Sequence, residues 1–136
     1  MNIDPWFVSG LVEGEGAFTY ISGGTPVFSI RQRHDYADLV QMIADFFGVG
    51  VVYPCRARGR SQANSYYRVH RAIDLNRIIQ HFDRYPLVSA RKQAAYAAWK
   101  KLVFFKQQGR QAVRRHRDQQ EALLKALSAL NCRGRS

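Results

Sequence analysis

The chain has 136 residues, of which 46% are hydrophobic, and this is enough for one domain with a core of its own. Lys and Arg number 21 against 10 Asp and Glu, so the net charge of +11 and the pI near 10.3 indicate a polyanionic partner. No apolar run is long enough to span a membrane and no signal peptide is predicted, so we expect an intracellular, non-secreted protein without a membrane partner, in a bacterial cytoplasm or an organelle.

The first expected element is an amphipathic helix that begins near residue 4 and ends in a glycine-rich turn. Asp4 is a suitable N-cap, and Pro5 suits the first helical position. The helix should break at Gly14-Glu15-Gly16, after which the chain leaves as a strand. This stretch combines two unusual features, a smooth helical face and a pair of acids.

Gly10 and Gly14 lie one helical turn apart and share a face without side chains, so a second backbone can approach it closely. Glu13 and Glu15 fall at the C-terminal end of the helix, where the helix dipole disfavours a carboxylate and a cation would compensate. Two such helices crossing at the glycines would bring two Glu15 carboxylates together. That arrangement is suitable for a divalent metal ion.

Hydrophobic periodicity predicts the order of the remaining elements. They are a strand over 17–22, a turn over 22–26, a strand over 27–33, a helix over 35–47, strands over 49–53 and 65–71, and helices over 74–85, 89–107 and 110–131. The loop over 55–64 is polar and basic. The pattern indicates an α+β protein with a four-stranded antiparallel sheet and additional C-terminal helices.

The expected strands have one apolar face and one polar, cationic face. Phe28 and Ile30 alternate with Ser29 and Arg31, and the strand over 65–71 repeats this alternation. Arginine suits bidentate contacts with phosphate and guanine, so the cationic face favours nucleic acid over a membrane surface. The candidate DNA-binding residues are Thr19, Ser29, Arg31, Arg33, Arg56, Arg58, Tyr66, Arg68 and His70.

Cysteines and histidines do not suggest a zinc site. Cys55 and Cys132 are too few for a disulfide framework and lack zinc-binding spacing, so we expect free thiols. The four histidines include no pair at the spacing that helical metal sites use.

The run from Gly10 to Phe18, with Val8-Ser9 before it, resembles the signature of the LAGLIDADG homing endonucleases. Glu replaces Asp at both acidic positions of the motif, and Val8-Ser9 replaces Leu-Ala. The segments 28–33 and 85–92 also resemble this family, and the likeness covers roughly the first hundred residues. Because the motif occurs once, the resemblance is to the single-motif, homodimeric branch.

The resemblance implies an αββαββα fold, with a four-stranded antiparallel DNA-binding sheet backed by helices. It implies one endonuclease domain over 1–136, with a core over 1–108 and a basic C-terminal helix over 109–136. The implied activity is site-specific cleavage of double-stranded DNA by a homodimer on a pseudo-palindromic target, with Mg²⁺ or Mn²⁺ as cofactor.

Site residues follow from the same resemblance, position by position. Glu15 and the Gly14 carbonyl are the expected metal ligands, and Gln32 would position solvent. Either Arg91 or Lys92 would stabilise charge at the phosphate. We expect Glu13 to orient the turn or its neighbours. The expected dimer interface consists of Phe7, Gly10, Glu13 and Gly14.

Two other readings remain open. The same fold could serve without cutting, as an RNA-binding intron maturase with intron RNA as partner or as a DNA-binding regulator. A basic RNA-binding domain, for example one associated with the ribosome, also fits the charge. Neither explains why a carboxylate at Glu15 would face a phosphate, so the nuclease is the preferred interpretation.

Overall fold

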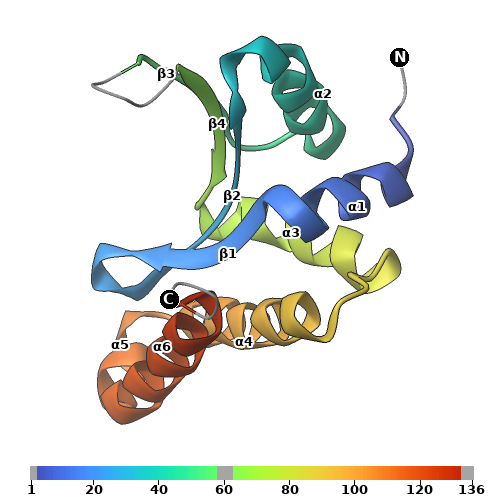
Figure 1. Ribbon diagram of the computed structural model, residues 1–136. Helices are drawn as coiled ribbons and strands as arrows, with labels where there is room; N and C mark the ends of the chain where they lie inside the picture. Colours follow the sequence, from blue (N-terminus) through green and yellow to red (C-terminus); the bar gives the residue numbers. More distant parts are fainter. Residues whose placement is uncertain (1–2, 58–62, 133–136) are drawn as a thin grey trace.

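The computed structural model describes residues 3–57 and 63–132. Its helices and strands follow the expected order along the chain (Figure 1). They are α1 (Pro5–Glu15), β1 (Gly16–Ile21), β2 (Thr25–Arg33), α2 (Ala37–Phe47), β3 (Val51–Cys55), β4 (Asn64–Val69), α3 (Ala72–Arg84), α4 (Ala90–Lys106), α5 (Arg110–Arg115) and α6 (Arg117–Cys132), with short 3-10 turns at Ser22–Gly24 and His34–Tyr36.

The first helix begins as the sequence predicts. The side chain of Asp4 accepts a hydrogen bond from the backbone N–H of Trp6 at 2.7 Å, and Pro5 follows as the first helical residue. The helix ends at Glu15 and β1 starts at Gly16, which is buried. A Cβ on Gly16 would lie 2.5 Å from a methyl carbon of Val12, so only glycine fits this tight junction.

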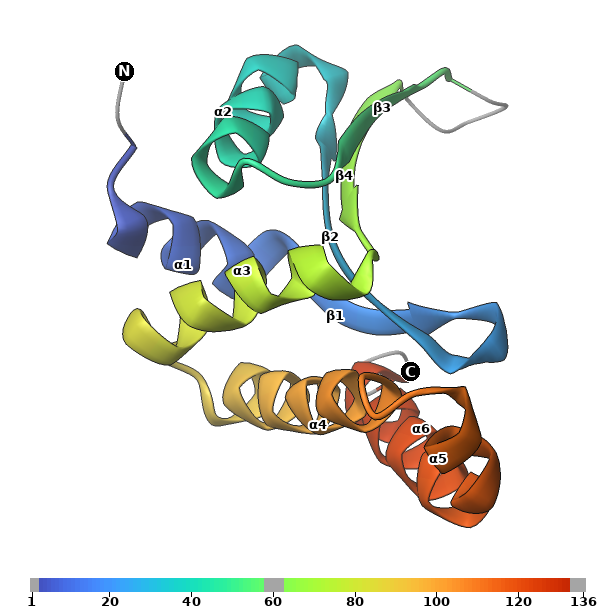
Figure 2. The same ribbon diagram turned by 180° about the vertical axis from the view of Figure 1, so that it is seen from behind.

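The four strands form one antiparallel sheet in the order β1-β2-β4-β3. In Figures 1 and 2, α1, α2 and α3 lie on one side of β2 and β4, and no helix of the described residues covers the other side. The α+β class and the four-stranded sheet are therefore confirmed. The uncovered side is called the open face below.

The core lies between the sheet and the helices and is rich in aromatic side chains. Phe18 is 1% exposed, and its ring centroid lies 5.2 to 5.4 Å from those of Phe28, Phe82 and Trp99. Burial of such large side chains is the main source of stability. Because Phe18 follows Gly16 by two residues, this cluster also fixes the α1–β1 junction.

The third strand starts two residues later than the periodicity predicts. Gly48 ends α2 in the left-handed region, and Gly50 also has a positive φ of 87°. A Cβ on Gly50 would come within 2.8 Å of the backbone oxygen of Arg68. The turn therefore occupies residues that the alternation alone assigned to a strand.

The expected single helix over 110–131 is wrong, because the structure divides it at His116. That residue has φ −118° and ψ 45°, which separates α5 from α6. The charged residues around His116 have no apolar side chains to bury in the core. The bend lets α6 lie against α4 and β1, where Leu127 is completely buried. Tyr20 and Ser128 share a hydrogen bond of 2.7 Å across this contact.

None of the helices in the described part of the chain is both long enough and apolar enough to cross a membrane.

His81 supports a prediction about pH and stability. It is 7% exposed among aromatic rings, its Nε2 lies 3.0 Å from the Ser9 hydroxyl, and burial lowers its pKa to about 4. The folded chain therefore keeps His81 neutral while the unfolded chain takes up a proton below about pH 6.5. The stability that this residue contributes is present above pH 6.5 and is lost as the pH falls toward 4.

We expect the free energy of unfolding, measured with urea, to fall by about 2 kcal/mol between pH 7 and pH 5 because of His81. The variant His81→Phe should lose this part of the pH dependence, whereas the exposed His116→Ala should keep it. An unchanged pH dependence in His81→Phe would contradict the assignment.

Candidate functional site

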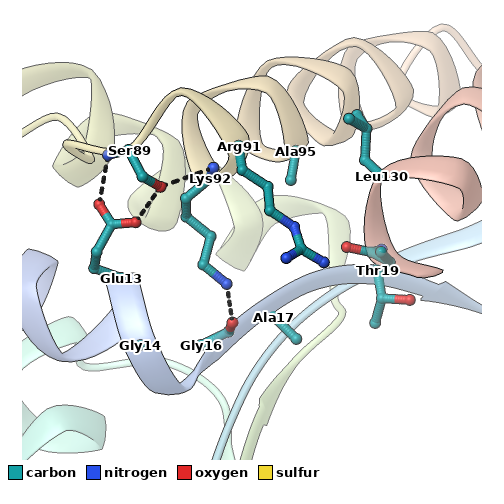
Figure 3. A pocket seen from close by; sticks show the side chains of 11 residues that line it. Glu13, Gly14, Gly16, Ala17, Thr19, Ser89, Arg91, Lys92, Ala95 and Leu130 are labelled. Atoms are coloured by element: carbon teal, nitrogen blue, oxygen red, sulfur yellow. Dashed lines mark hydrogen bonds between the residues drawn. The ribbon is translucent and has the colours of Figure 1, made fainter. Parts of the chain in front are cut away.

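An open pocket of about 490 Å³ lies where α1 meets β1 and the start of α4 (Figure 3). Residues from α1, β1, α4 and α6 line it, together with Ser89 just before α4. Five of them are predicted site residues: Glu13, Gly14, Thr19, Arg91 and Lys92. Segments that are far apart in the sequence are thus brought together in one pocket.

Glu13 faces the start of α4. One carboxylate oxygen accepts hydrogen bonds from the backbone N–H groups of Val88, at 2.6 Å, and Ser89, at 3.0 Å, and the other accepts one from the Ser89 hydroxyl. Partial burial works to raise the pKa of Glu13, but the bonds from Ser89 and Val88 and the nearby Lys92 outweigh it, so the pKa is lowered. The carboxylate is therefore ionised and engaged within its own chain, while its place in a dimer interface stays a prediction.

Lys92 reaches from the first turn of α4 to the α1–β1 junction. Its ammonium group donates a 2.7 Å hydrogen bond to the carbonyl oxygen of Gly16, the residue after Glu15 (Figure 3). Burial lowers the pKa of Lys92; Glu13 opposes this effect and the neighbouring Arg91 adds to it. The ammonium is thus a partly desolvated cation held beside the predicted metal ligands.

Arg91 lines the same pocket but is exposed, and Figure 3 shows its guanidinium group directed into the space above β1. No described ion pair involves it, whereas Lys92 has a specific backbone partner. Both alternatives from the sequence therefore lie in the pocket, and Lys92 is the one fixed against the junction.

Glu15 is exposed at the end of α1 and does not line the pocket. Gln32 lies on β2 two residues beyond Ile30, which pairs with Gly16, and it is partly buried at the same end of the sheet. Among residues 3–57 and 63–132, no group of three or more His, Cys, Asp or Glu side chains could hold a metal ion. Glu15 is therefore not part of a three-residue ligand cluster within the described chain.

The glycine face of α1 is open. Gly10 and Gly14 are exposed, and a Cβ added at either position would meet nothing within 4 Å. Phe7, on the same helix, is 48% exposed, and Trp6 is 56% exposed. Contacts within the chain do not require glycine at these two positions.

The open face of the sheet carries most of the predicted DNA-binding residues. Register pairs Ser29 with Arg68 and Arg31 with Tyr66, which places these four side chains on one face. The Arg31 guanidinium lies 4.9 Å from the centroid of the Tyr66 ring. Thr19 shares this face with Ala17, and both line the pocket, so the pocket continues onto the sheet.

The remaining predicted contacts lie around this face. Arg33 is exposed and forms a 3.1 Å ion pair with Asp35, and Arg56 is exposed after β3. His70 directly follows β4. The Nε atom of Arg68 is buried with no hydrogen-bond partner among the described residues. Arg58 lies outside the described residues.

The lining residues that sequence reasoning missed include Ser89, Leu130 and Asn131. Ser89 caps α4, since its hydroxyl accepts from the Lys92 backbone N–H at 3.1 Å. Leu130 and Asn131 reach the pocket from α6, and Asn131 donates to the Phe18 carbonyl at 2.9 Å. Of these three, only Ser89 could have been found from the sequence, as a Ser at the start of a helix. Leu130 and Asn131 could not, because α6 reaches the pocket only through the bend at His116.

Comparison with known proteins agrees with this geometry. A sequence model of a family described as LAGLIDADG endonuclease matches residues 8–103. An "Uncharacterized 50.9 kDa protein in ND4 intron 1" of Podospora anserina is 37% identical over 115 residues, which cover 75% of this chain and 24% of that protein. A "Probable intron-encoded endonuclease 3" of Neurospora crassa is 27% identical over 114 residues, or 76% of this chain and 20% of that protein. The chain thus spans a quarter or less of these two relatives.

Solved structures with the same fold include the LAGLIDADG meganuclease I-CpaMI bound to uncleaved DNA, with a TM-score of 0.70 and 25% identity over 82% of this chain and 41% of that one. The LAGLIDADG homing endonuclease I-GzeII, in complex with its DNA target, gives a TM-score of 0.62 and 28% identity over 75% of this chain and 35% of that one. The homing endonuclease I-TnaI, at 20% identity and a TM-score of 0.73, shares the fold over 96% of this chain and 99% of that one.

Proposed function

Because the chain belongs to the LAGLIDADG endonuclease family, we propose that it cuts both strands of a specific double-stranded DNA site. In this proposal it acts as a homodimer with a divalent metal ion, and residues 1–136 are one endonuclease domain with its core over 1–108. One observation carries the proposal. The exposed Glu15 and the partly buried Lys92, whose ammonium bonds to the Gly16 carbonyl, both lie at the α1–β1 junction, at the end of an open, cationic sheet face.

Chemistry at this junction fits phosphodiester hydrolysis. The carboxylate of the exposed Glu15 and the carbonyl of the exposed Gly14 are the hard oxygen donors that Mg²⁺ and Mn²⁺ prefer. A divalent ion bound there supplies charge neutralisation on the phosphate, an activated water and a stabilised leaving oxygen. Lys92 holds a positive charge next to this position, and Gln32 lies at the same end of β2 to orient solvent.

The open glycine face supports the homodimer. A glycine inside a helix costs about 1 kcal/mol relative to alanine, and nothing within the chain requires Gly10 or Gly14. Close approach of a second α1 explains both glycines and brings the second Glu15 that one chain lacks. A two-fold pair of such sites would cut a target whose half-sites mirror the symmetry of the protein.

The direct test is cleavage of a library of intron-insertion-like duplexes in the presence of Mg²⁺. We expect a double-strand cut at one target sequence, which EDTA abolishes. Binding to a duplex without any metal-dependent cut would contradict the nuclease and support a DNA-binding regulator instead. Binding to intron RNA in preference to every DNA duplex would support an RNA-binding maturase instead.

Arg31 provides a test of base recognition on the open face. We expect Arg31→Ala to relax preference at one base position at a cost of about 1–3 kcal/mol in discrimination, measured by binding to single-substitution targets. The exposed Arg77→Ala, on α3 on the opposite side of the sheet from the open face, is the matched control and should leave the preference unchanged. An equal loss on every target would show that Arg31 contacts only the DNA backbone.

Lys92 and Arg91 can be separated by substitution. We expect Lys92→Met to lower the single-turnover cleavage rate by at least about a hundredfold, because it removes a desolvated charge beside the reacting phosphate. Arg91→Met should weaken DNA binding and leave the rate on bound DNA within about threefold, because its exposed guanidinium is screened by solvent. The reverse pattern would assign the catalytic charge to Arg91.

A further inference from the structure

A continuous set of hydrogen bonds joins the end of α1 to the start of α4 and returns to β1. Glu13 accepts from the backbone of Val88 and Ser89 and from the Ser89 hydroxyl. The Ser89 hydroxyl also accepts from the backbone N–H of Lys92, and the Lys92 ammonium donates to the carbonyl of Gly16. Figure 3 shows the bonds that join Glu13, Ser89, Lys92 and Gly16 on one side of the pocket.

The circuit constrains the segment that precedes α4. Val88 is 83% exposed and Ser89 is also exposed, so apolar packing does not fix their backbone. Glu13 satisfies both of their N–H groups, which otherwise face solvent at the helix start. Gln93 donates from its side chain to the carbonyls of Leu87 and Val88 and from its backbone N–H to the carbonyl of Ser89, and these bonds leave the two N–H groups untouched.

Lys92 depends on this constraint because its side chain is long and flexible. The position of its ammonium is set by where the first turn of α4 places its Cα. A displacement of about 1 Å in a positioned catalytic group can reduce a rate about a hundredfold. Glu13 is the group from α1 that holds this turn.

We propose that Glu13 is a positioning residue, which fixes the start of α4 and so holds the Lys92 ammonium against the Gly16 carbonyl beside Glu15. This inference rests on the proposed cleavage activity and extends it to an acid of the motif that has no part in metal binding. Glu13 touches neither the metal nor the phosphate. It acts through Ser89 and Lys92.

The test compares one substitution that keeps the hydrogen bonds of Glu13 with another that removes them. Glu13→Gln keeps an oxygen to accept from the two backbone N–H groups and an amide to donate to the Ser89 hydroxyl. Glu13→Ala removes all three bonds. We expect Glu13→Ala to lower the single-turnover cleavage rate by about 10–100-fold with DNA affinity within about threefold, and Glu13→Gln to restore the rate to within about threefold of the natural protein.

Asp83→Ala is the matched control. Asp83 also ties α4 to a neighbouring helix through a carboxylate, which accepts from Tyr96 and Lys100 at 2.8 Å, but it lies away from the pocket. This variant should lose stability and keep the cleavage rate. Equal rate losses in Glu13→Ala and Asp83→Ala, or a Gln variant as slow as the Ala variant, would overturn the proposal.

Amide hydrogen exchange tests the inference without cleavage. In Glu13→Ala we expect at least about tenfold faster exchange at Val88 and Ser89 and unchanged exchange in the middle of α4, while Glu13→Gln should resemble the natural protein. Should Glu13→Ala not fold, Ser89→Ala should still slow cleavage, because it removes the hydroxyl bonds to Glu13 and to the Lys92 backbone N–H and keeps the two backbone N–H bonds to Glu13. If the natural protein cuts no duplex, the proposed function fails, whereas unchanged exchange at Val88 and Ser89 overturns the role of Glu13 itself.

Discussion

Glu15→Gln is expected to abolish DNA cleavage and to leave DNA binding almost intact. The amide has nearly the shape of the carboxylate but carries no negative charge, so it cannot hold a divalent cation at the end of α1. We expect the single-turnover rate with Mg²⁺ to fall by at least about a thousandfold, which corresponds to about 4 kcal/mol. The dissociation constant for the target should change by less than about threefold, because the open face of the sheet is untouched.

Glu121→Gln is the control, since Glu121 is an exposed acid on α6 and is not a lining residue of the pocket. It should cut at the natural rate. A second readout is the binding of Mn²⁺ itself, followed by its paramagnetic relaxation in the presence of an uncleavable duplex. Retention of both cutting and Mn²⁺ binding by Glu15→Gln would remove Glu15 from the site and leave the proposed mechanism without its main ligand.

Local chemistry made much of this fold predictable. Asp4 and Pro5 fix the start of α1, Ser89 caps α4, and the alternation of Phe28 and Ile30 with Ser29 assigns the two faces of β2. Each of these signals lies within a few residues of the element that it determines. The placement of Lys92 beside the motif was expected only because of the family resemblance, since the two segments lie far apart in the chain.

Other features depend on contacts that a local pattern does not encode. The bend at His116 follows from packing of α6 on α4 and β1, and it brings Asn131 into the pocket. The start of β3 follows from the crowding of Gly50 against Arg68. The three bonds that Glu13 receives from the start of α4 needed the fold to place residues 13 and 89 together.

Gly10→Ala is expected to stabilise the single chain and to weaken its association. The added methyl group meets nothing within 4 Å of its own chain, and alanine is favoured over glycine inside a helix by about 1 kcal/mol. In the proposed dimer the same methyl would separate two crossing helices. We expect the free energy of unfolding of the monomer to rise by about 0.5–1 kcal/mol, and the dimer dissociation constant to rise at least about tenfold in sedimentation.

The opposite signs of these two effects make the experiment decisive. A glycine kept only for the backbone of its own chain would give a less stable alanine variant, and a neutral surface position would give no change in association. Gln80→Ala, on the exposed side of α3, is the control for a helix-favouring change away from α1 and should leave association unchanged. Gly10→Leu should then abolish both association and cleavage while the chain stays folded, because each Glu15 would lose the second carboxylate. A natural protein that cuts DNA as a monomer would show that one chain completes the site without this contact.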